Sequence, residues 1–274
     1  MIRPDLSVIT NISLDHTNLL GNTLAEIAFE KAGIIKPNTP VIIGERQPET
    51  DPVFIKKAKE QKAPLVFAED LLQTSNIIKK SNFLQVDIYQ QKETLLKNLK
   101  LDLSGSYQLK NIITVLETVE SLRKNGYHIP EDAIYQALKN VKKLTGLQGR
   151  WQTLAKAPLI ICDTGHNKAG INEVLHNIEQ TKYQTLHMVI GMVKDKDING
   201  VLQLLPKNAH YYFCTPQLER ALPSKELAEQ AALYHLKGSA YATVAAALNA
   251  AKEKAKKEDL IFVGGSTFVV AEII

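Results

Sequence analysis

Short apolar runs alternate with helix-like stretches over the first quarter of the chain. The runs at 5–12, 39–44 and 63–68 predict buried strands, because strands covered on both faces carry nearly continuous apolar side chains. The stretches at 23–36 and about 51–62 are typical of helices. Strands that alternate with helices in this way predict an α/β fold with a parallel sheet.

The first predicted helix carries signals at both of its ends. Thr23 is a candidate N-cap, and Glu26, three residues later, completes a capping box. Gly33 lies near the predicted end, and Pro37 follows it, as is common after helices. The sequence therefore predicts both where this helix begins and where it ends.

The middle of the chain has a different pattern. Between residues 83 and 103, the segments FLQVDIY and LKLDLS predict two short strands with polar residues between them. A long helix is expected over about 106–124, because its apolar residues keep helical spacing. Gly126 is a natural stop for this helix, and Pro130 suits the first turn of a following helix at 130–141.

The stretch 142–149 has two glycines and no periodic pattern, so we interpret it as a linker between two domains. After it the strand–helix alternation restarts, which predicts a second domain with an α/β fold. Ser224 is a candidate cap for one of its helices. The expected strands are 158–163, 186–192, 210–214 and 260–264, and the expected helices are 168–180, 196–205, 224–237 and 242–257.

Composition narrows the class of protein. The 274 residues are 45% apolar and 23% charged, which excludes a disordered or fibrous chain and suggests about two domains. The net charge of +4 implies no nucleic-acid surface by itself, and no apolar run reaches the ~18 residues of a membrane helix. No signal peptide is recognised at the N-terminus, so we expect a cytoplasmic protein. Cys162 and Cys214 lie in predicted strands and are expected to be buried free thiols.

Three common active-site loops are absent from the sequence. No glycine is followed by lysine, so there is no phosphate-binding loop of the G-x-x-x-x-G-K-[ST] type. There is also no G-x-G dinucleotide fingerprint and no G-x-S-x-G nucleophile elbow. The candidate chemistry must therefore lie in polar clusters that follow the predicted strands, where open α/β sheets bind their ligands.

Two candidate sites lie in the first domain. The first predicted strand has Thr10 and Asn11 near its end and is followed by Asp15 and His16. His16 could bind a metal through one ring nitrogen, or it could simply hydrogen-bond the loop backbone. Lys31 lies near the end of the first predicted helix, where a lysine is most often a surface residue that favours the helix C-terminus.

A third cluster surrounds the first predicted strand of the second domain. Its members are Arg150, Asp163, His166 and Asn167. A strand that ends in a turn before a helix directs backbone N–H groups and the positive helix end at an anion, and Arg150 could add a guanidinium for phosphate. Alternatively, Asn167 only caps the helix and Asp163 pairs with a neighbouring group. The residues alone leave both interpretations open.

Taken together, six segments resemble the folylpolyglutamate synthase family, a relative of the Mur ligases. They occur in the family's order along the whole chain: SVITNISLDHTNLLG, TLAEIAFEKAGIIKP, LSGSYQLKN, GLQGRWQ, ICDTGHN and FVGGSTFVVAE. The resemblance implies an α/β fold in which 1–145 is the C-terminal part of a P-loop-type ATPase domain and 146–274 is a Rossmann-like, mostly parallel C-terminal domain. It also implies ATP-dependent ligation of L-glutamate to the γ-carboxyl of a reduced folate with ATP and Mg²⁺, in a monomer that binds neither nucleic acid nor membranes.

The resemblance implies roles for residues of the first domain. His16 matches the family's magnesium-binding histidine. Lys31 matches a lysine that is carbamylated in the family, and a carbamate offers Mg²⁺ an anionic oxygen. A further match comprises Gly105, Gln108 and Asn111, which are expected to give structural support at the start of the long helix.

The resemblance also implies roles for the third cluster. Arg150 and Asp163 match residues that contact ATP, and Asn167 is expected to bind ATP with them. His166 matches a histidine near the phosphates and the acyl transfer, so His166 and Lys31 are the expected catalytic residues. The sequence reads D-T-G-H-N where the family usually has D-G-A-H-N, so the shape of this turn remains open.

The chain departs from the family at its N-terminal end. In the family, the phosphate loop and an acidic magnesium ligand precede the strand that matches SVITNI, whereas only a few residues precede it here. The resemblance therefore implies a family member that lacks about its first third, binds ATP poorly by itself and turns over little. Two alternatives stay open: a Mur-type ligase that adds an amino acid to a cell-wall precursor, and a truncated, non-catalytic binding protein.

Overall fold

The structure, a computed structural model, consists of two compact units, and it describes residues 3–15, 17–80, 82–91 and 93–274. Unit 1 comprises Met1–Asp102 and Tyr107–Thr145, and unit 2 comprises Leu103–Ser106 and Gly146–Ile274. The chain therefore passes from one unit to the other three times.

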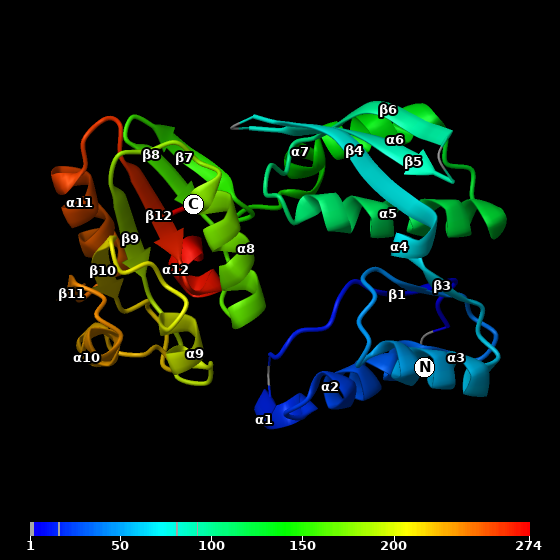
Figure 1. Cartoon of the computed structure of the whole chain (residues 1–274), viewed down its shortest axis with the longest axis horizontal. Helices are drawn as coiled ribbons and strands as arrows, with labels where there is room; N and C mark the ends of the chain where they lie inside the picture. The colour runs from blue at the N-terminus through cyan, green and yellow to red at the C-terminus, as the bar shows by residue number, and fades with distance from the viewer. Residues whose placement is uncertain (1–2, 16, 81, 92) are drawn as a thin grey trace. The chain divides into compact units, whose positions relative to one another are not determined.

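A small parallel sheet carries the first part of unit 1 (Figure 1). Its strands lie in the order β1 (Ser7–Ile9), β2 (Val41–Ile43) and β3 (Leu65–Phe67). The connecting helices are α1 (Thr17–Leu20), α2 (Leu24–Lys31), the 3-10 turn η1 (Ala32–Ile34) and α3 (Asp51–Gln61). The predicted parallel strands are confirmed, although each is shorter than expected, and α1 is an addition to the prediction.

The capping box at the start of α2 is confirmed. The Glu26 N–H donates to Thr23 Oγ1 over 3.2 Å, and Glu26 Oε2 accepts from the Thr23 N–H at 3.0 Å. The same oxygen accepts from the Asn22 N–H at 2.7 Å, and these backbone donors lower the pKa of Glu26. The local sequence thus fixes where the helix that carries Lys31 begins.

A three-stranded antiparallel sheet forms the second layer of unit 1. Its strands are β4 (Leu72–Lys79), β5 (Leu84–Gln90) and β6 (Glu93–Leu101), and the short helix α4 (Ala68–Leu71) precedes them. The first of the two predicted strands, FLQVDIY, is confirmed as β5. The second, LKLDLS, overlaps only the end of β6, which begins earlier, and β4 was missed. Antiparallel strands with one exposed face need few apolar residues, and register shifts in β4 and β6 break the alternation further.

The long predicted helix is α5 (Gln108–Lys124), which lies between the two sheets of unit 1 (Figure 1). Ile112, Ile113 and Leu116 pack in one core with the buried residues of β5 and with Ile42 of β2. Two further helices complete the unit, α6 (Glu131–Lys139) and α7 (Val141–Thr145). The predicted linker at 142–149 is therefore partly helical, which corrects the prediction. The sequence pattern did not reveal α7 because this helix buries no residue.

Unit 2 is built on a six-stranded sheet. The strand order is β11 (Gly238–Tyr241), β10 (His210–Cys214), β9 (Leu186–Ile190), β12 (Leu260–Gly264), β8 (Leu159–Cys162) and β7 (Gln152–Lys156). All neighbours are parallel except β7, which runs antiparallel to β8. The expected mostly parallel sheet is confirmed. The two edge strands β7 and β11 were missed because they are short and not fully buried.

Alternate residues of the central strands bury opposite faces of this sheet. Met188, Phe213 and Phe262 pack in the core that contains α8 (Lys168–Glu179), α9 (Ile198–Leu202) and α10 (Ser224–Leu233). Cys162 and Cys214 pack on the other face with α11 (Val244–Lys254) and α12 (Thr267–Ala271). Both cysteines are buried free thiols, as expected, and burial raises the pKa of Cys214 to about 12. Within the described ranges, no helix has both the length and the apolar character to cross a bilayer.

The predicted cap at Ser224 is wrong. Pro223 occupies the N-cap position of α10, and Ser224 is the first helical residue. Ser224 is buried, and its N–H donates to Thr215 Oγ1 over 2.8 Å. The first donor of this helix is therefore satisfied by a side chain from the end of β10, which local sequence does not reveal.

A buried polar network lies at the amino ends of the strands of unit 2. His187 at the start of β9 contacts the Tyr212 hydroxyl through Nδ1 at 3.0 Å and Asp259 Oδ2 through Nε2 at 3.4 Å. Burial is the main cause that lowers the pKa of His187. Burial acts to raise the pKa of Asp259, but donors that include the N–H groups of Lys256 and Thr185 hold it below its ordinary value.

Candidate functional site

The carboxylate of Asp163, directly after β8, is held by two backbone N–H groups. Oδ2 accepts from the Trp151 N–H at 2.7 Å, and Oδ1 accepts from the Gly165 N–H at 2.8 Å. The Thr164 N–H donates to Gly149 O over 3.0 Å, which ties the same two segments again. Because only 3% of Asp163 is exposed, this carboxylate fixes the turn at 149–151 to the end of β8.

Arg150 lies at the tip of that turn and is exposed. Its Nη1 donates to Thr164 Oγ1 over 2.9 Å. The next residue, Trp151, is buried, stacks on Phe262 with ring centroids 6.3 Å apart, and has a positive φ of 47°, which is rare for so large a side chain. A buried anchor thus holds the backbone beside Arg150 while its guanidinium remains accessible.

His166 and Asn167 complete the turn that leads into α8. His166 Nδ1 lies 2.9 Å from Thr164 O, and a carbonyl can only accept, so Nδ1 donates the hydrogen in this contact. Asn167 is the N-cap of α8, and its Oδ1 accepts from the Gly170 N–H at 2.8 Å. The predicted capping role of Asn167 is therefore confirmed, and its contact with ATP stays a prediction.

The start of α8 is electrostatically suited to an anion. The positive end of the twelve-residue helix lies next to His166, and Lys168 is its first residue. Lys168 Nζ pairs with Asp197 Oδ2 at 3.0 Å, and Gly200, which lacks a side chain, leaves the space that this lysine crosses. The Gly200 N–H donates to Asp197 and, with Lys168, lowers the pKa of that carboxyl.

The structure thus brings the third cluster together around Thr164, which binds both Arg150 and His166. Both interpretations of Asp163 and Asn167, as residues that bind a ligand or as residues that only support the loop, are compatible with this arrangement. Each of these two side chains holds the loop that Arg150 and His166 share. Their roles in ATP binding and catalysis stay predictions.

The structure says less about the predicted site residues of unit 1. His16 lies outside the described residues. Lys31 is the last residue of α2 and is exposed, and its side chain forms no hydrogen bond or ion pair with another described residue. No group of three His, Cys, Asp or Glu side chains within residues 3–15, 17–80, 82–91 and 93–274 is arranged to hold a metal ion. Metal binding by His16 and Lys31 therefore remains a prediction.

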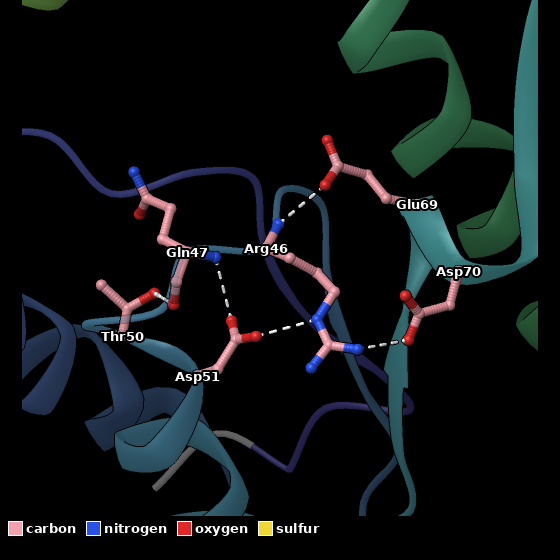
Figure 2. A network of polar contacts seen from close by, with 6 residues as sticks. All are labelled: Arg46, Gln47, Thr50, Asp51, Glu69 and Asp70. Atoms are coloured by element: carbon pink, nitrogen blue, oxygen red, sulfur yellow. Dashed lines mark hydrogen bonds and ion pairs between the residues drawn. The ribbon is translucent and has the colours of Figure 1, made fainter.

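Sequence reasoning missed a polar network at the carboxyl ends of β2 and β3 (Figure 2). The Arg46 backbone N–H donates to Glu69 Oε2 over 2.9 Å. Its Nε donates to Asp51 Oδ2 over 2.8 Å, and its Nη1 donates to Asp70 Oδ2 over 2.7 Å. The guanidinium also lies 4.2 Å above the Phe67 ring, and Asp51 is the main cause that raises the pKa of Arg46.

Gln47 extends this network to the loop that follows β1. Its backbone N–H donates to Asp51 Oδ1 over 3.0 Å, and its Nε2 donates to Ile12 O over 3.0 Å. Its Oε1 is buried and has no hydrogen-bond partner in the described part of the chain. The network thus supports the loop that carries Asp15. The rule that ligands gather at strand ends could have found Arg46, Glu69 and Asp70, because all three follow predicted strands.

Comparison with known families agrees with the fold. Residues 1–119 match the family model of the Mur ligase middle domain, and residues 149–267 match that of the Mur ligase glutamate ligase domain. Only 120–148 and 268–274 lie outside these two matches, and the chain belongs to the Mur ligase family.

Its relatives are folate enzymes of that family. The dihydrofolate synthase/folylpolyglutamate synthase of Escherichia coli (strain K12) is 33% identical over 279 residues, which cover 100% of this chain and 60% of the relative. The structure of E. coli FolC in complex with DHPP and ADP superimposes with a TM-score of 0.82 at 30% identity, over 98% of this chain and 60% of that one.

A bifunctional folylpolyglutamate synthase/dihydrofolate synthase with Mn, AMPPNP and L-glutamate bound gives a TM-score of 0.79 at 26% identity, over 98% of this chain and 61% of that one. The chain spans about three fifths of the length of these relatives. The expected α/β fold is thus shared with these solved structures.

Proposed function

We propose that this chain serves the ATP-dependent ligation of L-glutamate to the γ-carboxyl of tetrahydrofolate and its polyglutamates. The observation that carries the proposal is the cluster of Arg150, Thr164 and His166 at the carboxyl end of β8, in the part of the chain that matches the glutamate ligase domain. The folate enzymes among its relatives favour this reaction over ligation to a cell-wall precursor.

The proposed reaction has two stages. A carboxylate oxygen of the folate attacks the γ-phosphorus of ATP, so that ADP leaves and an acyl phosphate forms. The amine of L-glutamate then attacks the acyl carbon, loses a proton, and phosphate leaves. Both stages depend chiefly on positioning and on neutralisation of negative charge.

The residues of unit 2 have distinct parts in this proposal. Arg150 binds phosphate oxygens through its guanidinium fork, which its partner Thr164 helps to orient. Asp163 and Asn167 hold the loop in place through backbone N–H groups and in this way support the nucleotide site. His166 presents its ring near the phosphates and the reacting amine.

The residues of unit 1 fit a magnesium ion in their chemistry. An exposed lysine with no partner among the described residues, as Lys31 is, is open to carbamylation, and a carbamate oxygen and the His16 ring would both be ligands. When bound, Mg²⁺ would neutralise charge on the phosphates. We propose that the protein works in the cytoplasm as a monomer with small-molecule substrates.

The proposal can be tested by ligand binding to the full chain. Calorimetric titrations would compare L-glutamate with D-glutamate, and tetrahydrofolate with a nucleotide-sugar peptide, in the presence of Mg-ADP. We expect L-glutamate and tetrahydrofolate to bind selectively. Selective binding of the nucleotide-sugar peptide, or of neither acceptor, would contradict the proposal.

A second readout is ADP release with Mg-ATP, tetrahydrofolate and L-glutamate, with each substrate left out in turn. ADP release that depends on both folate and glutamate would support the reaction.

A further inference from the structure

A single side chain ties the loop after β1 to the loop after β2. Gln47 Nε2 donates to Ile12 O over 3.0 Å, across 35 positions of the sequence. Residues 10–15 belong to no helix or strand, and within the described part of the chain no other hydrogen bond reaches a backbone group of residues 11–14. The Gln47 amide is therefore the polar anchor of this loop.

The backbone at Gln47 is itself fixed by the start of α3. Its N–H donates to Asp51 Oδ1 over 3.0 Å, and its carbonyl oxygen accepts from the N–H groups of Thr50 at 3.0 Å and Asp51 at 2.9 Å. Figure 2 shows the Gln47 side chain extending away from Asp51. A hydrogen-bonded turn thus carries the amide that holds the loop after β1.

Ile12 is held by its side chain as well as by its carbonyl. The side chain is 2% exposed and packs in the core that contains Ile27 and Ala28 of α2. A buried side chain fixes the place of a residue but leaves its peptide group able to rotate, whereas the bond to Gln47 also fixes the direction of the carbonyl. His16 follows four positions later, so the course of the chain toward it is set at Ile12.

The amide of Gln47 leaves one of its own groups without a partner. Oε1 is buried and forms no hydrogen bond within the described residues. The opposite orientation would place Oε1 against Ile12 O, where two acceptors repel each other, so the loop determines which way the amide points. A buried acceptor without a partner costs stability, and an apolar side chain of the same length would avoid that cost. Glutamine at this position is therefore explained by its effect on the loop and not by stability.

We propose that Gln47 is a positioning residue, which raises the affinity of the His16 site for Mg²⁺ by fixing the loop through Ile12. This inference rests on the proposed function, which assigns the metal to His16 and Lys31. Gln47 acts through the loop and does not itself touch the ion. Loss of a residue that orients a metal ligand lowers metal affinity by roughly 10–100-fold.

Gln47→Met in the full chain tests this proposal, with Mn²⁺ as the probe because electron paramagnetic resonance detects free Mn²⁺ directly. We expect the substitution to lower Mn²⁺ affinity about tenfold. It removes the bond to Ile12 O and also the unpaired Oε1, and these two effects on stability oppose each other, so the unfolding midpoint should change little. Hydrogen exchange of residues 11–15 should become faster, while exchange of α3 should stay the same.

A double-mutant cycle separates positioning from a general effect on the protein. In a His16→Gln background, Gln47→Met should cause no further loss of Mn²⁺ affinity, because the loop then carries no histidine to position. Gln73→Met makes the same substitution at an exposed position of unit 1, and it should leave both Mn²⁺ affinity and hydrogen exchange unchanged. If Gln47→Met did not fold, Gln47→Asn would provide the same comparison, since its amide is too short to reach Ile12 O.

The outcomes distinguish this inference from the proposed function. An unchanged Mn²⁺ affinity in Gln47→Met, or an equal loss in both backgrounds of the cycle, would overturn the role of Gln47 alone. An unsubstituted chain that binds no Mn²⁺, or whose Mn²⁺ affinity is unaffected by His16→Gln, would overturn the metal site of the proposed function and this inference with it.

Discussion

The carboxylate of Asp163 lies 2.7 Å from the backbone nitrogen of Trp151, twelve positions earlier in the chain. This bond closes a turn in which Trp151 has a positive φ and a buried ring, so the backbone is held in a conformation that it would otherwise rarely adopt. The turn presents Arg150 to solvent beside Thr164. The candidate nucleotide site thus depends on Asp163, whose side chain binds backbone N–H groups.

We expect Asp163→Asn to destabilise unit 2. The amide can accept at one oxygen only, so one of the two N–H groups loses its partner, which costs about 1–3 kcal/mol for a buried group. Trp151 is the single tryptophan of the chain, so urea denaturation followed by its fluorescence reports on this unit. Glu219→Gln at an exposed position is the control, and an equal unfolding midpoint for both variants would contradict the prediction.

Arg150→Gln is expected to affect nucleotide binding rather than stability. The side chain is exposed, so the free energy of unfolding should change by less than about 0.5 kcal/mol. Loss of charged hydrogen bonds to phosphate should lower ADP affinity by roughly tenfold or more. Arg150→Lys should be intermediate because it keeps the charge but not the fork. Calorimetry with ADP decides, and a loss as large in the exposed control Lys237→Gln would argue against a specific contact.

Two glycines of unit 1 form a matched pair for a stability test. A Cβ on Gly44 would collide with the Thr10 carbonyl oxygen and the Thr114 hydroxyl, whereas a Cβ on Gly33 would meet nothing within 4 Å. We therefore expect Gly44→Ala to cost about 1–3 kcal/mol. Gly33→Ala should be neutral or stabilising by up to about 1 kcal/mol. Urea denaturation followed by circular dichroism measures both, and similar values for the two variants would be the contrary result.

The network around His187 predicts a pH dependence of stability for unit 2. The pKa of His187 is lower in the folded protein than in the unfolded chain. Below about pH 6.5 the folded state therefore binds fewer protons than the unfolded state does. Stability from this residue is therefore complete above pH 6.5 and declines as the pH falls toward the folded pKa. The groups that face His187 are Asp259, Tyr212, His210 and Lys254.

His187→Gln tests this prediction, because the amide can accept from Tyr212 and donate to Asp259 without titrating. Unfolding midpoints from Trp151 fluorescence would be measured at pH 7.5 and pH 5.5. The decrease between the two should be smaller in the variant than in the unsubstituted chain. An identical decrease would show that other groups govern this pH range.

Local signals in the sequence determined much of the fold. The Thr23 and Glu26 capping box and the apolar run of β10 were predicted correctly because each depends on neighbours in sequence. The helix α7, the edge strand β11 and the strand β4 were missed because they bury few residues. The cap at Ser224 was predicted wrongly because its N–H binds a residue from another segment.

Part of the candidate site could also be predicted from the sequence. That Asp163 and His166 lie together at one strand end follows from the rule for parallel sheets. Arg150 precedes β7 and reaches this end because β7 runs antiparallel to β8. That both oxygens of Asp163 bind backbone N–H groups does not follow, because it requires the antiparallel return of β7 along β8.

Residues 103–106 belong to unit 2 although their sequence neighbours on both sides belong to unit 1. Buried Ser104 donates through Oγ to Trp151 O over 3.4 Å, and the Ser106 N–H donates to Asn177 Oδ1 over 3.0 Å. A gene fragment that begins at 146 therefore lacks part of the unit that it encodes. Unit 2 cannot be exchanged by recombination as one continuous gene segment, because its limits in the sequence and in space differ. An exchange of the whole unit must also include four residues that lie between the two sequence segments of unit 1.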